Sequence, residues 1–374
     1  MEFKLIIKKI NNTLSKSELE IFNTWFNEKT EHQKYFKNVN ENYAYNITHI
    51  DVEKGWQKIS ARIEPPKQRK LYWKYVAAVL VLISTSYFFV IKNTSDTIKT
   101  AIVVKNNIDV GTNKALLTLE NGSIVTLQKG QQYISNNIKS NGENLIYKDE
   151  SNSKSEIVYN YLTIPRGGQF YVKLSDGTKV WLNSESKLKY PVTFIDGKPR
   201  KVELVYGEAY FDVSPSTSHK GSKFQVTTNQ QKIEVLGTEF NIKAYKDESK
   251  IYTTLVEGKV TVFNGFNQET LKPSNQSIIS NTGKEIFINT VNVYYETSWK
   301  DGVFSFKDMP LKDIMKVLSR WYDVNIIFKN KNIENEEFFG VLKKNQNLED
   351  ILLTIKNTNF IKNYEIDNKT IIIE

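Results

Sequence analysis

Residues 71–91, LYWKYVAAVLVLISTSYFFVI, constrain this chain more than any other part of its sequence. From Tyr75 onward the stretch contains no charged residue, no proline and no glycine. At about 1.5 Å of helical rise per residue it spans roughly 30 Å, the thickness of the hydrocarbon core of a bilayer. A soluble helix rarely lacks a polar face over such a length. The sequence therefore predicts one transmembrane helix at residues 71–91.

Basic residues flank this stretch unequally. The fifteen residues before Tyr75 hold five lysines or arginines, and the fifteen after Ile91 hold three. Because the excess of Lys and Arg marks the cytoplasmic side, this asymmetry puts the N-terminus in the cytoplasm and the larger C-terminal part outside it.

The charge balance is basic, with a net charge of +9 over 374 residues. Residues 1–74 hold 14 basic and 9 acidic residues, or +5 of that total, and much of it lies next to the apolar stretch. This placement favours a positively charged membrane flank and a lysine-rich solvated surface over a nucleic-acid interface. The absence of cysteine excludes disulfides, zinc–thiolate sites and thiol nucleophiles.

The segment before the apolar stretch has the pattern of short amphipathic helices. Ser15 and Glu18 have the spacing of a capping box at the start of a helix. So many apolar and aromatic side chains in so short a segment indicate a face that a partner protein completes. A DNA-binding helix-turn-helix is the competing interpretation, although no helix here clearly matches a recognition helix. The side chains expected to form the binding face are Leu19, Phe22, Trp25, Phe26 and Trp56.

A hairpin pattern occurs twice after residue 100. Asn121-Gly122 and Asp176-Gly177 each lie between two runs of alternating hydrophobic residues, which is typical of a β-hairpin. Both copies fit L-x-(N/D)-G-(S/T)-x-V-x-L and are 55 residues apart. The pattern predicts a duplicated hairpin.

The fold class expected for the whole chain is multi-domain. Further strands are predicted up to residue 291, with Gly207 as a tight bend between strands at 201–206 and 208–213, and they indicate an all-β antiparallel domain. The last 75 residues have the order βαβ-βαββ of a small α+β domain. The predicted organisation is a small all-α cytoplasmic domain at 1–70, a transmembrane helix at 71–91, the all-β domain at 92–298 and the α+β domain at 299–374.

Motifs of catalysis are absent from the sequence. It contains no HExxH, no phosphate-binding loop and no G-x-S-x-G, and its three histidines are scattered. The prediction is a non-enzymatic chain without metal or cofactor that acts by binding a partner on each side of a membrane.

Several stretches in the same order resemble the FecR-type anti-sigma factors, and the resemblance covers roughly residues 100–374. The stretches are 162–169 (LTIPRGGQ), 174–183 (LSDGTKVWLN), 207–213 (GEAYFDV), 235–241 (VLGTEFN), 253–258 (TTLVEG), 304–306 (FSF), 311–315 (LKDIM) and 320–324 (RWYDV).

The resemblance implies a function and two partners. In this family, helices in the cytoplasm bind an extracytoplasmic-function sigma factor, so no direct contact with nucleic acid is expected. The periplasmic part receives a signal from the periplasmic signalling domain of a TonB-dependent outer-membrane transporter. Trp321 and Tyr322 are the residues expected to bind this transducer. The implied location is the inner membrane, with a single crossing and the C-terminal region in the periplasm.

Release of the sigma factor has two explanations. One is a conformational change, and the other is cleavage by an intramembrane or periplasmic protease. Some family members resemble self-cleaving proteins that break at a Gly-Thr bond, and Gly237-Thr238 lies in the matching motif. Two alternatives to the anti-sigma function stay open, namely a membrane-anchored DNA-binding regulator and a periplasmic glycan-binding or assembly protein.

Overall fold

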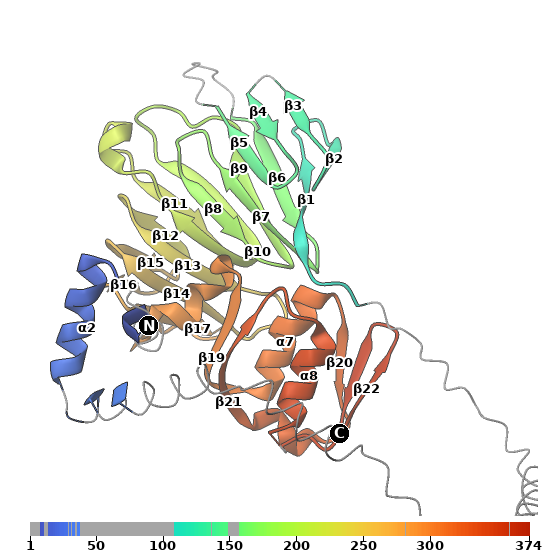
Figure 1. Ribbon diagram of the computed structural model, residues 1–374. Helices are drawn as coiled ribbons and strands as arrows, with labels where there is room; N and C mark the ends of the chain where they lie inside the picture. Colours follow the sequence, from blue (N-terminus) through green and yellow to red (C-terminus); the bar gives the residue numbers. More distant parts are fainter. Residues whose placement is uncertain are drawn as a thin grey trace, which may run out of the picture. The chain divides into compact units, whose positions relative to one another are not determined.

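The computed structural model describes residues 8–10, 14–28, 30, 32–33, 36–37, 108–135, 137–148, 157–280, 282–358 and 360–374. The chain divides into two compact units, Met1–Ile102 and Val103–Glu374, here called the first and second units (Figure 1). The predicted transmembrane segment 71–91 and Trp56 lie outside the described residues. No helix within the ranges given above is long and apolar enough to cross a membrane. The inner-membrane location stays a prediction.

Helix α2 (Lys16–Glu28) is the main element described in the first unit. It begins with the predicted capping box, because Ser15 N–H donates to Glu18 Oε2 (3.0 Å) and Glu18 N–H donates to Ser15 Oγ (3.3 Å). A side-chain hydrogen bond from Lys8 lowers the pKa of Glu18 to about 2. The start of this helix is therefore confirmed as the sequence predicts it.

The second unit contains a large β-domain whose strands form two ladders that share one long strand. The first ladder has the order β2-β1-β6-β9-β10-β11-β12-β15-β16, and the second β3-β4-β5-β7-β8-β10-β13-β14-β17-β18. The strands are β1 (Thr112–Thr118), β2 (Ile124–Gln128), β3 (Tyr133–Ser135), β4 (Ile138–Ser140), β5 (Asn144–Tyr147), β6 (Tyr159–Ile164), β7 (Gly168–Lys173), β8 (Lys179–Leu182), β9 (Ser186–Pro191), β10 (Arg200–Asp212), β11 (Phe224–Thr227), β12 (Lys232–Val235), β13 (Glu239–Ala244), β14 (Lys250–Glu257), β15 (Val260–Phe263), β16 (Gln268–Leu271), β17 (Asn275–Ser280) and β18 (Phe287–Thr290), with the short helix η1 (Ser216–His219) between β10 and β11.

Buried side chains of both ladders meet in one hydrophobic core. Leu188 and Val226 belong to the first ladder, and Val172 and Phe240 to the second. The alternation of buried and exposed positions along most strands is the sequence pattern that predicted them, since neighbouring side chains of a strand point to opposite faces.

The duplicated hairpin is confirmed. The first copy joins β1 to β2 and the second joins β7 to β8. In both, the side chain before the glycine accepts a hydrogen bond from the backbone two residues on, Ser123 N–H to Asn121 Oδ1 (2.9 Å) and Thr178 N–H to Asp176 Oδ1 (3.0 Å). Gly122 has φ +81°, a left-handed conformation that this turn chemistry requires.

A smaller C-terminal domain follows the helices α6 (Val293–Thr297) and η2 (Ser298–Asp301). Strand β19 pairs antiparallel with β21, while β23 pairs parallel with β20 and antiparallel with β22. Helices α7 and α8 complete a second hydrophobic core. The elements are β19 (Val303–Pro310), α7 (Leu311–Tyr322), β20 (Asn325–Phe328), η3 (Lys331–Asn335), β21 (Glu337–Lys343), α8 (Leu348–Lys356), β22 (Tyr364–Asp367) and β23 (Thr370–Ile373).

The predicted fold class is wrong as a description of this structure. Strands dominate it, and within the described part of the first unit α2 and a few further helical residues are too little to make an all-α domain. The β-domain is not purely antiparallel, because β1 and β5 pair parallel with β7, and β10 pairs parallel with β11. A period of two in the sequence identifies a strand but does not tell the direction of its neighbour.

The prediction of a tight bend between two strands at Gly207 is also wrong. Gly207 does not end a strand, since β10 runs through it from the first ladder into the second. Its φ of +99° and the irregular register between Leu204 and Tyr206 allow the strand to change ladders there. A Cβ at Gly207 would lie 2.2 Å from Ser186 Oγ, so the close approach of β9 also requires glycine.

Candidate functional site

The residues predicted to bind a sigma factor lie along α2 where the structure describes them. Phe22 is buried, with its ring 5.3 Å from that of Phe36 and 5.7 Å from that of Phe26. Trp25 and Phe26 are half-buried, and Leu19 is 37% exposed. Phe22 thus packs inside the first unit, whereas the exposed parts of Leu19, Trp25 and Phe26 are available to a partner.

Ile21 is a further apolar side chain on α2, outside the predicted binding face. It is 50% exposed. At 100° per residue, Ile21 and Leu19 flank the stripe of Trp25, Phe22 and Phe26 on its two sides. Its place four residues before Trp25 was the signal in the sequence that could have identified it.

The Gly237–Thr238 bond, predicted as a self-cleavage point, lies just before β13. Gly237 has φ +157°, and Thr238 is buried. The Thr238 hydroxyl donates to the carbonyl of Lys259 (3.1 Å), and Val213 N–H donates to Thr238 O (3.1 Å). A backbone carbonyl is no base that could take the hydroxyl proton at neutral pH. Self-cleavage at this bond stays a prediction.

Trp321 and Tyr322, predicted to contact a transducer, are buried in the core of the C-terminal domain. Trp321 Nε1 donates to the carbonyl of Lys344 (2.8 Å), and the Tyr322 hydroxyl donates to that of Gln346 (2.7 Å). Both side chains therefore hold the C-terminal end of α7 against the chain after β21, and neither presents its ring to a partner.

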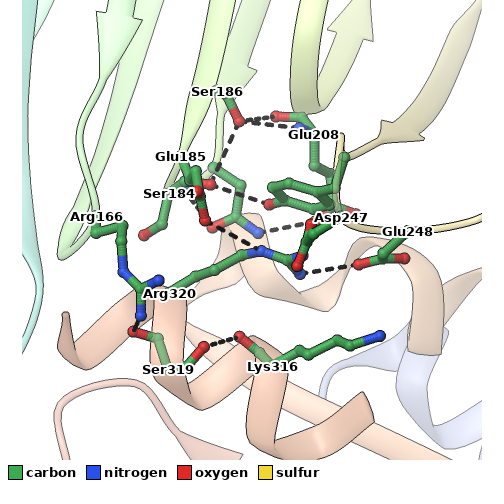
Figure 2. A network of polar contacts seen from close by, with 12 residues as sticks. Arg166, Ser184, Glu185, Ser186, Glu208, Asp247, Glu248, Lys316, Ser319 and Arg320 are labelled. Carbon is green, nitrogen blue, oxygen red and sulfur yellow. Dashed lines mark hydrogen bonds and ion pairs between the residues drawn. The ribbon is translucent and has the colours of Figure 1, made fainter. Parts of the chain in front are cut away.

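Arg320, the residue before them, connects the two domains of the second unit. Its side chain extends from the last turn of α7 into the β-domain (Figure 2). There its Nη1 donates to Glu248 Oε1 (2.9 Å), its Nη2 donates to Asp247 Oδ1 (2.6 Å), and its Nε lies 3.4 Å from Glu185 Oε2. The guanidinium also lies 3.6 Å from the ring centroid of Tyr245. Only 4% of the side chain is exposed, so one buried cation serves three carboxylates.

Arg166, in the loop between β6 and β7, extends in the opposite direction, from the β-domain to the C-terminal domain. Its Nη2 donates to the carbonyls of Ser319 (2.8 Å) and Val324. In the same loop Gly167 N–H donates to the carbonyl of Arg320 (2.7 Å). Carbonyls at the end of a helix have no partner within it and favour positive charge. The β-domain therefore caps the C-terminal end of α7.

Lys344, just after β21, places a third cation between the domains. Its Nζ donates to Gln169 Oε1 of β7 (2.6 Å) and to the carbonyl of Trp299 (3.4 Å), and it lies 3.7 Å from the ring centroid of Trp321. Burial lowers the pKa of Lys344 to about 7, although the charge of Glu208 acts in the opposite direction. The contacts of Arg320, Arg166 and Lys344 are together called the joint.

A buried carboxylate lies next to the joint. Glu208 of β10 accepts hydrogen bonds from the amides of Asn183 (2.9 Å) and Asn241 (3.0 Å). Asn241 in turn accepts one from Trp299 Nε1 (3.3 Å), in the helix that leads into the C-terminal domain. Burial raises the pKa of Glu208. This chain of hydrogen bonds fixes the connection between the two domains, since each buried polar group has its partner.

The chemistry of the joint suits domain docking. Throughout the described ranges, no group of His, Asp and Glu side chains could hold a metal ion. Two separate hydrophobic cores are instead joined by two guanidinium groups, the amine of Lys344, the carboxylates around Arg320 and the carbonyls at the end of α7. The sequence showed the motifs that contain Arg166, Glu208 and Arg320 but not that they meet.

Lys344 should make the stability of the second unit depend on pH. The unfolded chain keeps the lysine proton up to its ordinary pKa of 10.5, whereas the folded chain loses it near pH 7. The unfolded state then binds more protons, so the free energy of unfolding rises between pH 7 and 9, by about 2 kcal/mol from this group. Urea unfolding at both pH values should show this increment in the native chain and not in a Lys344→Met variant. Equal increments in both would contradict it.

Comparisons with known proteins match the two domains that the joint connects. A family model described as FecR protein matches residues 160–261, and one described as FecR, C-terminal matches residues 303–373. Two crystal structures of a protein assigned as an anti-sigma factor from Parabacteroides distasonis ATCC 8503, at 1.65 and 2.50 Å resolution, have TM-scores of 0.52 and 0.51. The chain is 29% and 30% identical to them, over 57% of its own length and 98% of theirs. No curated protein matches the chain.

Proposed function

Because the chain belongs to the FecR family of anti-sigma factors, we propose that its first unit binds an extracytoplasmic-function sigma factor through α2. The observation that supports this surface is the pair of exposed apolar side chains, Leu19 and Ile21, on the two sides of a packed aromatic stripe. A partner helix laid along such a stripe would cover both side chains.

The second proposed partner is the periplasmic signalling domain of a TonB-dependent transducer, which would bind the C-terminal domain. Strand β21 supports this contact. Its outward side chains include Phe339 and Val341, which are 71% and 51% exposed. Among the described residues β21 pairs only with β19, so its other edge is free to accept a strand. This surface replaces the buried Trp321 and Tyr322 as the proposed contact.

Charge placed on the α2 surface should weaken binding of the sigma factor. We expect Leu19→Asp and Ile21→Asp to reduce the affinity of the full-length chain by about tenfold each, because an apolar contact would be replaced by a charge that must be desolvated. Thr24→Asp, on the opposite face of α2, is the matched control. Isothermal titration with the purified sigma factor measures the three affinities.

Two outcomes would count against this proposal. One is that the Leu19→Asp and Ile21→Asp variants both bind the sigma factor as tightly as the Thr24→Asp variant does. The other is that the chain binds no sigma factor and retards promoter DNA in a gel, which would favour a DNA-binding regulator.

A further inference from the structure

The chain enters the β-domain through the joint. Residues 108–113, called the strap, precede and begin β1. Ile108 and Val110 are partly buried, and they pack against the core of the C-terminal domain instead of that of the β-domain. The strap therefore contacts the C-terminal domain before its chain joins the first ladder.

Gly111 brings the strap directly against Trp321. A Cβ at Gly111 would lie 2.6–2.7 Å from Cδ2, Cε2 and Cε3 of the indole, closer than carbon atoms approach one another. The indole is itself fixed by its hydrogen bond to the carbonyl of Lys344 (2.8 Å) and by the Lys344 ammonium over its ring. A glycine is thus required at this place by the fit of the two domains.

The polar side of the strap is held by the β-domain. Thr112 N–H donates to the carbonyl of Gly167 (3.0 Å), and Thr112 and Asn113 pair parallel with Gly168 and Gln169. Gln169 donates to Asn113 Oδ1 (3.2 Å) and accepts from Lys344, so one amide connects the strap to the joint.

We propose that the docked C-terminal domain holds the strap and that opening of the joint frees it. The inference rests on the proposed relay, and it specifies where a signal leaves the second unit. A partner that moves the C-terminal domain acts on residues 108–113 by direct contact, without rearranging the core of the β-domain. The strap is the first described part of the second unit, and it follows the first unit in the sequence. Ile108, Val110 and Gly111 contact the C-terminal domain, so opening of the joint removes these contacts and lowers the local stability of the strap.

The rates of hydrogen exchange at three backbone amides of the full-length chain test this proposal. Thr112 N–H reports the strap, Gly167 N–H, which donates to Arg320 O, reports the joint, and Val213 N–H, which donates to Thr238 O, reports the β-domain. An Arg320→Met variant opens the joint without touching the strap. We expect hydrogen exchange at Gly167 and Thr112 to become faster together, by about tenfold relative to exchange at Val213, which reports the loss of global stability.

A Gly111→Ala variant tests the same contact from the side of the strap. Its added methyl group forces the strap and Trp321 apart, so exchange at Gly167 should again rise by about tenfold. Gly340→Ala is the matched control, because a Cβ there has nothing within 4 Å, and it should exchange like the native chain. Thermolysin, which cleaves before large apolar residues, should cut at Ile108 or Val110 in the two joint variants only.

The proposal is overturned if Arg320→Met accelerates exchange at Gly167 and leaves Thr112 unchanged, because the β-domain alone would then hold the strap. It is also overturned if Gly111→Ala leaves Gly167 as protected as in Gly340→Ala. Neither measurement uses a sigma factor or a transducer, so this failure is distinct from a failure of the first unit to bind its partner.

Discussion

An Arg320→Met variant should unfold with a free energy about 3 kcal/mol lower than that of the native chain. Methionine keeps most of the apolar stem but removes the guanidinium, which lies over the Tyr245 ring and is shared by Glu185, Asp247 and Glu248. Glu248 retains Lys243, 2.8 Å away, and Asp247 is exposed enough to be hydrated. The expected loss of unfolding free energy is therefore near the lower end of the range for removing one partner of a fully buried ion pair.

Chemical denaturation of the native chain and two variants measures this loss. Lys369→Met is the control, because it removes a cation from an exposed pair with Asp323. Such a pair contributes less than about 1 kcal/mol. If Arg320→Met were no less stable than Lys369→Met, the three carboxylates would not depend on Arg320, and the joint would be held by other contacts.

A larger loss is expected from the Asp176→Leu variant. Asp176 and Arg200 form an ion pair of 2.7 Å in which the side chains are only 1% and 2% exposed. Removal of the carboxylate leaves a buried guanidinium without its counter-charge and should cost about 3–5 kcal/mol. It also removes the acceptor for Thr178 N–H and the Thr178 hydroxyl in the second hairpin.

The double variant Asp176→Leu/Arg200→Met separates these two effects. It replaces both charges by apolar side chains, so it should be more stable than the single variant by about 2 kcal/mol or more. Thermal unfolding followed by circular dichroism compares the three chains. A double variant as unstable as the single one would mean that the hairpin contacts, and not the buried charge, account for the loss.

Local turn chemistry was predictable from the sequence. The Asn-Gly hairpin, the Asp-Gly hairpin and the capping box at Ser15 depend on neighbouring residues, and the structure has all three. Each is determined by contacts between residues two or three apart, which a sequence displays directly. The same turn pattern gave no sign that Asp176 also holds Arg200.

Contacts between distant residues were not predictable in this way. The period-two pattern around Gly207 indicated two strands, whereas tertiary packing makes one strand that serves both ladders. Trp321 and Tyr322 were expected at a binding surface. The sequence does not distinguish an exposed Trp or Tyr from a buried one whose polar atom has a hydrogen-bond partner. Gly167 and Arg320 lie 153 positions apart, and only the fold brings their backbones together.

Transcription in vitro tests the central claim most directly. RNA polymerase, the extracytoplasmic-function sigma factor and its promoter are combined with the full-length chain or with its Leu19→Asp/Ile21→Asp variant. We expect the native chain, in slight molar excess over the sigma factor, to suppress the transcript and the variant to leave most of it. A transcript that the native chain leaves unchanged, under conditions where the sigma factor is active, would contradict the proposal that α2 holds the sigma factor.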